Sequence, residues 1–294
     1  MRVIEAFDQG VQAIAVSPDG RFLAAASPDV VALWDWSGGD CWRAKHPHSL
    51  QLAMSPDGAW LAAGNYGYLR LYPTDGRLST RLESPRRDAL LAGGVSFAPT
   101  GKYLVASRDR YPGSPPDGGG LMRWQVLTWK QELGFDQDWP AFPRLASSPN
   151  GEYVAGINNR VCEIRFAVSG GISCRVRNRE RGGQGYLTFS PDSQMAVCGW
   201  EAEFHVVELI GGKVTRVVRT SGPPFQDVAY TGNGQHVGTV DSNGQLRLWE
   251  TTEWREVRAF DWAAGPLTSL AFTTDGLTGV CGTLRGQLIL FDLD

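Results

Sequence analysis

Residues 17–20 read Ser-Pro-Asp-Gly, and the same four residues return at 55–58. In this order the serine can bond the backbone of a turn, the proline presets φ, and the glycine suits a position with positive φ. The tetrapeptide therefore predicts a hairpin turn with a strand on each side. The flanking segments Ala13–Val16 and Phe22–Ala26 are apolar, as such strands require.

Degenerate copies of this turn make it a repeat. They read Ala-Pro-Thr-Gly at 98–101, Ser-Pro-Asn-Gly at 148–151, Ser-Pro-Asp-Ser at 190–193, Thr-Gly-Asn-Gly at 231–234 and Thr-Thr-Asp-Gly at 273–276. Successive copies begin 38, 43, 50, 42, 41 and 42 residues apart. A period of about 40–45 residues is typical of repeats that each form one four-stranded sheet.

Each repeat continues in the same way after the turn. A second apolar strand follows, then a third strand that ends in an aromatic residue, and then a more polar fourth strand. The aromatic is followed by an acid at Trp34-Asp35, Trp249-Glu250 and Phe291-Asp292. In the strand before each turn, large apolar residues alternate with small ones, which predicts a first strand buried on both faces.

The turn, the aromatic-acid pair and the period resemble the WD40-repeat family, over the whole chain. The resemblance implies an all-β fold, in which residues 1–294 form a single seven-bladed β-propeller with four antiparallel strands per blade. The family's Gly-His dipeptide is absent from every copy. Its buried Asp-His-Ser/Thr-Trp network therefore cannot form as in the family, although blade six keeps Thr239, Asp241 and Trp249.

The two ends of the chain predict how the ring closes. After the last turn there is room for only two more strands, the second of them Gln287–Asp292, so the last blade lacks a fourth strand. Residues 2–7 form a spare apolar segment before the first repeat. We expect this segment to pair with Gln287–Asp292 as the outer strand of the last blade, and to bury two or three of the side chains of Val3, Ile4 and Phe7.

Composition excludes several classes of protein. Glycine (36) and proline (17) make about 18 % of the 294 residues, against a usual ~12 %, which excludes a helical bundle. Eleven tryptophans and a net charge of −3 exclude a disordered chain, and a pI of 5.9 argues against nucleic-acid binding. No signal-like start or long apolar run is present, so we expect a cytoplasmic protein without membrane contact.

Few residues in the sequence suggest a catalytic or metal-binding site. The five cysteines are odd in number and lack zinc-like spacing, which predicts reduced thiols. His46 and His48 flank a proline without a further ligand in reach, and we expect both to be solvated in a loop. We therefore predict no metal, no cofactor and no catalytic activity. A modest charge and a closed ring predict a monomer.

The longest spacing between successive turns, 50 residues, marks the candidate binding surface. It contains an insertion at residues 108–120, between the second and third strands of blade three, and the resemblance places such connections on the top face of the ring. Arginine and aromatic residues are common at interfaces. The candidate partner-binding residues in this and neighbouring loops are Arg108, Arg110, Tyr111, Trp139, Arg179, Arg181, Trp200, Phe225, Trp262 and Arg285.

We therefore expect a non-catalytic scaffold that binds a protein or peptide on its top face. One alternative is an enzyme or small-ligand binder with its site at the mouth of the central channel. Histidines and carboxylates that converge there would favour it. A second alternative places an acidic partner on the rim, because Arg175 and Arg177 share one face of the outer strand of blade four.

Overall fold

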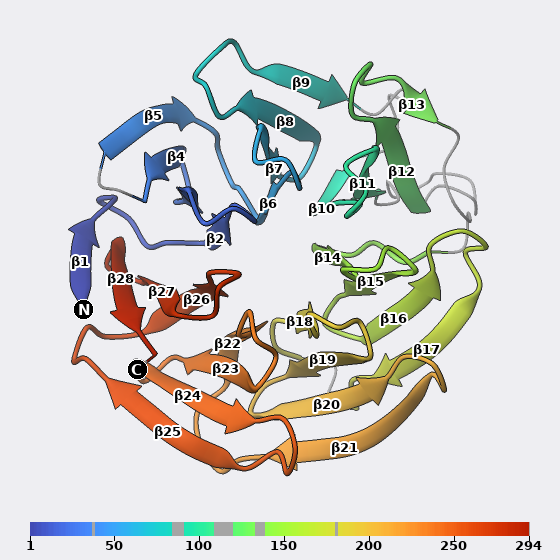
Figure 1. The fold of residues 1–294 in the computed structure, drawn as a ribbon, viewed down its shortest axis with the longest axis vertical. Helices are drawn as coiled ribbons and strands as arrows, with labels where there is room; N and C mark the ends of the chain where they lie inside the picture. Colours follow the sequence, from blue (N-terminus) through green and yellow to red (C-terminus); the bar gives the residue numbers. More distant parts are fainter. Residues whose placement is uncertain (37–38, 84–90, 109–119, 133–138, 180–181, 294) are drawn as a thin grey trace.

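The computed structural model describes residues 1–36, 39–83, 91–108, 120–132, 139–179 and 182–293. These residues form 28 strands and no helix, arranged as seven four-stranded antiparallel sheets around a central channel (Figure 1). The seven-bladed propeller predicted from the repeats is confirmed, including a complete blade at each copy of the turn.

The blades are numbered in chain order, and the strands of each blade run from the innermost to the outermost. Blade one holds β2 (Ala13–Val16), β3 (Phe22–Ala26), β4 (Val30–Asp35) and β5 (Gly39–Lys45). Blade two holds β6 (Gln51–Met54), β7 (Trp60–Gly64), β8 (Tyr68–Pro73) and β9 (Thr80–Glu83). Blade three holds β10 (Leu91–Phe97), β11 (Tyr103–Arg108), β12 (Gly120–Gln125) and β13 (Gln131–Glu132). Blade four holds β14 (Arg144–Ser147), β15 (Tyr153–Ile157), β16 (Val161–Phe166) and β17 (Ile172–Arg177).

The remaining blades follow the same order. Blade five holds β18 (Tyr186–Phe189), β19 (Met195–Trp200), β20 (Glu203–Glu208) and β21 (Lys213–Arg219). Blade six holds β22 (Phe225–Tyr230), β23 (His236–Asp241), β24 (Gln245–Glu250) and β25 (Glu256–Asp261). Blade seven holds β26 (Leu267–Phe272), β27 (Thr278–Thr283), β28 (Gln287–Asp292) and, as its outer strand, β1 (Arg2–Glu5).

The repeated turn has the chemistry that its residues predict. In the first copy the Ser17 hydroxyl accepts the N–H of Phe22 at 2.8 Å and donates to Asp19 Oδ1 at 2.5 Å. Hydrogen bonds from Ser17 and from the backbone N–H of Arg21 lower the pKa of Asp19. Gly20 has φ +71°, and Ser193 takes φ +58° at the same place in the one copy that lacks glycine. The side-chain bonds therefore hold the hairpin even where the glycine is replaced.

Residues 93–97 of the innermost strand β10 are buried throughout, as predicted, but other innermost strands differ from the prediction of burial on both faces. The second strands β3 and β15 are buried at every residue, but the first strands β2, β6 and β14 carry half-buried residues at most positions. The reason is their place in the ring, since residues of these three strands line the central channel (Figure 1).

The ring closes as predicted, with β1 antiparallel to β28 and Arg2 opposite Leu290 (Figure 1). The strand ends at Glu5, before the predicted limit, because the N–H groups of Ala6 and Phe7 both turn to the carbonyl of Gly286. Of the three apolar side chains of this segment, Val3 remains 44 % exposed. Ile4 and Phe7 are half-buried, and Ala6 is fully packed against blade one.

Packing between blades forms the core. Each of the seven hydrophobic clusters combines residues of two neighbouring blades, so every blade is stabilised by both neighbours. All five cysteines are free thiols, and Cys162, Cys174 and Cys198 pack together between blades four and five. Among the described residues, no helix has the length and apolar character needed to cross a membrane.

Candidate functional site

The two ends of the ring carry different connections. Because the strands of a blade alternate in direction, the links from second to third strands and the links between blades lie at one end. We call this end the top face. The repeated turns and the links from third to fourth strands lie at the other end, the bottom face. A channel runs between the two faces, and all seven innermost strands surround it (Figure 1).

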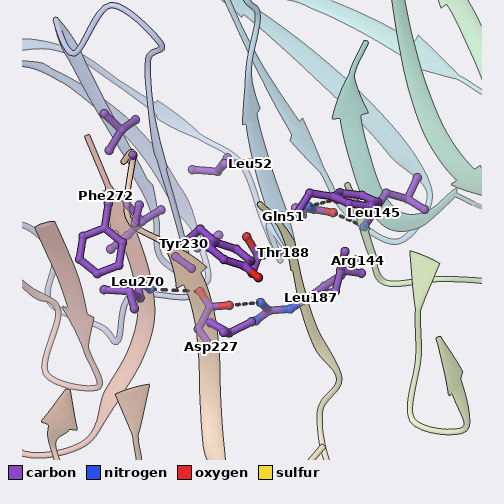
Figure 2. A pocket seen from close by; sticks show the side chains of 18 of the residues that line it. Gln51, Leu52, Arg144, Leu145, Leu187, Thr188, Asp227, Tyr230, Leu270 and Phe272 are labelled. Atoms are coloured by element: carbon purple, nitrogen blue, oxygen red, sulfur yellow. Dashed lines mark hydrogen bonds and ion pairs between the residues drawn. The ribbon is translucent and has the colours of Figure 1, made fainter. Parts of the chain in front are cut away.

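The channel holds a cavity of about 590 Å³ lined mainly by apolar side chains such as Leu52, Leu187 and Phe272 (Figure 2). Among the described residues that line it, Asp227 is the one carboxylate and Arg144 the one guanidinium, and no histidine is present. These lining residues do not form the group of several histidines and carboxylates that would favour a catalytic site in the channel.

Gln51 extends from β6 to the inner strands of two further blades. Its Oε1 accepts the N–H groups of Val95 in blade three at 3.0 Å and of Leu145 in blade four at 2.9 Å. Its Nε2 donates to the carbonyl of Leu145 at 2.6 Å, as Figure 2 shows from the side of the channel. One side chain therefore ties blades two, three and four together.

Two glycines in β10 allow this reach. A Cβ at Gly94 would lie 2.4 Å from the carbonyl oxygen of Phe142, and a Cβ at Gly93 would lie 2.4 Å from Leu50 Cδ1. Gly93 also has φ +90°, a conformation that other residues adopt at a cost. Because blade three presents only backbone here, blades two and four approach closely enough for Gln51 to bridge them.

Arg144 and Asp227 make the second link across the channel. Arg144 Nη1 lies 2.7 Å from Asp227 Oδ1, and each side chain is 15 % exposed (Figure 2). Asp227 Oδ2 accepts the N–H of Leu270 in blade seven at 3.0 Å. Blades four, six and seven are joined in this way. Both charges of the pair therefore have a partner within the ring.

Sequence reasoning missed this channel network of Gln51, Arg144 and Asp227, although a signal for it exists. Each of the three stands four residues before the first residue of the turn in its own repeat. The same position in the other four repeats holds small or less polar residues: Ala13, Gly94, Tyr186 and Ser269. Comparing repeats position by position, instead of strand by strand, would have singled out the three.

The predicted partner-binding residues divide by exposure. Arg179 and Arg285 are exposed, and Arg108 and Trp262 are half-buried. Trp262 stacks on Phe260, with ring centroids 5.6 Å apart, and leans on Phe291 at 5.0 Å. All four are on the top face. Arg110, Tyr111 and Arg181 lie outside the described residues. Arg108 pairs with Gly120, so the insertion does connect the second and third strands of blade three.

Three of the predicted residues are buried between blades. Trp139, Trp200 and Phe225 are 3 %, 4 % and 2 % exposed, and each belongs to a different inter-blade cluster. Trp200 also donates its indole N–H to the carbonyl of Asn158 at 2.6 Å, from blade five to blade four. Their burial leaves these three side chains little surface to offer a partner.

Exposed apolar side chains that the sequence reasoning did not select occur at both ends. Tyr66 and Leu284 are exposed on the top face, in the links between the second and third strands of blades two and seven. Leu127, Val168 and Ile210 are exposed on the bottom face, in the links between the third and fourth strands of blades three, four and five. Isolated exposed apolar residues are common, so position alone does not select one face.

His46 differs from the expectation that it is solvated. Its ring is fully buried, and Nδ1 lies 2.9 Å from the hydroxyl of Tyr72. Burial, with a smaller effect of the Arg70 charge, lowers the pKa of His46 to about 4. His48 is exposed. In the part of the chain that the structure describes, no group of three or more histidine, cysteine or acidic side chains is placed to hold a metal ion.

A model of the WD domain, G-beta repeat, matches residues 1–35, which include the first turn and the Trp34-Asp35 pair. The segment that matches also forms most of blade one and the closing strand of blade seven, in a ring of seven such blades. This match and the seven-bladed ring together support the WD40-repeat family for the chain. A search of curated proteins found no match to it. WD40 propellers generally serve as scaffolds for protein interactions.

The WD40 signature network survives in part in blade six. The Trp249 indole N–H donates to the Thr239 hydroxyl at 2.9 Å. The histidine that links the aspartate to the threonine in the family's network is missing from this repeat. Asp241 Oδ1 instead accepts the N–H groups of Asn243 and Gln245 within its own hairpin. The WD40 blade therefore keeps its tryptophan anchor without the complete network.

Proposed function

We propose that this WD40 propeller is a non-catalytic scaffold that binds a protein or peptide partner on its top face. The observation that carries the proposal is the combination of exposed Arg179 and Arg285 with Tyr66, Leu284 and the half-buried Trp262 at one end of the ring. Tryptophan, tyrosine and arginine are the residues that most often dominate binding energy at protein interfaces.

The packing of Trp262 supports an anchoring role. Its ring packs against both Phe260 and Phe291, so it loses little side-chain freedom when a partner covers it. The Arg285 side chain lies over Gly265, in the same link between blades six and seven that contains Trp262. An aromatic surface beside a guanidinium suits a partner that combines apolar and acidic side chains.

The channel gives less support to the alternative of an enzyme or small-ligand binder. Its cavity is of a size that a small ligand would fill. Three of its polar side chains are already engaged, since Arg144 pairs with Asp227 and Gln51 bonds to the backbones of blades three and four. A ligand that recruited any of these three would have to break bonds that join the blades. Among the described lining residues, Gln12 Oε1 and the Tyr230 hydroxyl have no hydrogen-bond partner.

Affinity capture from an extract of the native host, with quantitative mass spectrometry, tests the proposal. The wild-type chain should enrich a partner that a top-face variant, Tyr66→Ala with Arg285→Glu, captures at least about tenfold less. A bottom-face variant, Leu127→Ser with Val168→Ser, is the matched control and should retain the partner. Loss of the partner by the control alone would move the site to the bottom face and overturn the proposal.

A further inference from the structure

A groove of about 970 Å³ follows the seam between blades four and five on the outer side of the ring. Its walls come from β17 and the residues that follow it, and from β20 and β21. Four arginines and two glutamates are among the residues that line it: Arg175, Arg177, Arg179, Arg219, Glu201 and Glu203. The groove is therefore positively charged in a protein whose net charge is negative.

Two of the four arginines are neutralised locally. Arg219 pairs with Glu203, which also lies 2.9 Å from His205 Nε2, and Arg175 pairs with Glu163 at 2.5 Å. Arg177 and Arg179 make no ion pair with any residue that the structure describes. Both side chains are exposed, so their charges are available to a ligand in the groove.

His205 does not add to this charge at neutral pH. Burial lowers the pKa of His205 below its ordinary value, and the nearby guanidiniums of Arg219 and Arg179 act in the same direction. The Glu203 carboxylate opposes this effect without reversing it. The excess positive charge of the groove thus comes from Arg177 and Arg179, which outnumber the one remaining lining carboxylate, that of Glu201.

The groove also has an apolar floor. Val176 and Trp200 are buried at its base, Val214 is half-buried, and Val217 is exposed within it. The bond from the Trp200 indole to the Asn158 carbonyl joins the two blades directly beneath the groove. A ligand would therefore meet a preformed surface rather than one that must first become ordered.

The strands that border the groove have free edges. β17 and β21 are the outermost strands of their sheets, so each is paired on one side only. The backbone groups on the other side can bond an added extended segment, while side-chain contacts set its specificity.

We infer that the groove between blades four and five binds an extended acidic segment of a protein partner, in which carboxylates face Arg177 and Arg179 and alternate apolar side chains contact Val217 and the floor. This inference rests on the proposed function and adds the partner's chemistry and a second part of its binding surface. The occupant is a polypeptide rather than a small anion, because the charged rim, the apolar floor and the free strand edges lie along one seam.

Fluorescence anisotropy with labelled ten-residue peptides tests the inference on the full chain. A peptide of alternating glutamate and valine should bind at least about tenfold more tightly than one of alternating lysine and valine, and more weakly at high salt than at low salt. A peptide of alternating glutamate and glycine should bind more weakly than the glutamate-valine peptide, because it lacks the apolar contacts. Equal binding of the glutamate and lysine peptides would overturn the inference.

Charge reversal in the groove gives the sharper result. The variant Arg177→Glu with Arg179→Glu should lose at least about tenfold in affinity for the glutamate-valine peptide and gain affinity for the lysine-valine peptide. The control, Lys102→Glu with Lys130→Glu, makes the same change in net charge at two exposed side chains of blade three, away from the groove, and should bind as the wild type does. An equal loss in the control would show general charge attraction and refute a built site.

Two further results separate this inference from the proposed function. Arg177→Gln with Arg179→Gln should give an intermediate affinity, and its thermal unfolding should match the wild type because both side chains are exposed. If the wild type captures a partner but discriminates none of the peptides, the groove inference fails and the top-face proposal stands. If the peptides bind as expected but no partner is lost from the top-face variant, the top-face proposal fails.

Discussion

Replacing Gln51 by alanine removes three hydrogen bonds that join blades two, three and four through the channel. The N–H groups of Val95 and Leu145 and the carbonyl of Leu145 lose their partner, at 3.0, 2.9 and 2.6 Å in the wild type. Alanine has no polar group to offer them, so water in the channel is the available replacement.

The magnitude follows from the number of bonds and the access of water. A hydrogen bond contributes about 0.5–1.5 kcal/mol net to stability, so three lost bonds cost about 2–4 kcal/mol. The channel cavity of about 590 Å³ admits water, which places the expected loss near the lower half of that range. At about 2 °C per kcal/mol for a chain of this size, Tm should fall by about 4–6 °C.

Differential scanning calorimetry of Gln51→Ala measures this change. Gln12→Ala is the matched control, because Gln12 lines the same channel and its buried Oε1 has no hydrogen-bond partner among the described residues. The control should shift Tm by less than about 2 °C, as a substitution that removes no bond. A Gln51→Ala protein with the same Tm as the Gln12→Ala control would refute the view that the channel network stabilises the ring.

Three further predictions concern closure, the insertion and a buried histidine. Deleting residues 1–8 removes β1, including the half-buried Ile4 and Phe7, and uncovers the edge of β28. Because this apolar burial is lost, Tm should fall by more than about 5 °C in a thermal melt. A fall of less than about 2 °C would contradict the closing role of β1. Replacing residues 108–120 by Asn-Gly should leave the circular dichroism spectrum and Tm unchanged, because Ser107 and Leu121, which would flank the new turn, already face each other across the hairpin. The same replacement should reduce partner capture. For His46, the folded-state pKa of about 4 lies below the unfolded value, so the unfolded chain takes up the proton first as pH falls from about 6.5 to 4 and stability is lost over that interval. His46→Phe should abolish about 2–3 kcal/mol of the difference in unfolding free energy between pH 7 and pH 4.5, measured by urea titration, and an unchanged difference would exclude His46 as its source.

The number of blades, the positions of most strands and the closing strand follow from the sequence alone. Turn residues such as Ser17 and Asp19 act on their own hairpin, within five residues of each other, so their effect is local and readable along the chain. The spare segment before the first repeat predicts β1 by the same logic, because a blade with three strands requires a fourth. Which face of β1 is buried depends on the packing of blade one, so the sequence alone does not decide that Val3 is the apolar side chain left exposed.

The polar and aromatic residues of the candidate sites were decided by tertiary structure. Gln51 bonds to Leu145, 94 residues away, and Arg144 pairs with Asp227, 83 residues away, because the ring brings together strands from separate repeats. The tryptophans at 139 and 200 stand next to links on the top face, yet both turn into the space between blades. A local pattern records that such a side chain is large and apolar. Whether it is buried depends on the neighbouring blade, and no contiguous stretch of sequence contains both surfaces of that contact.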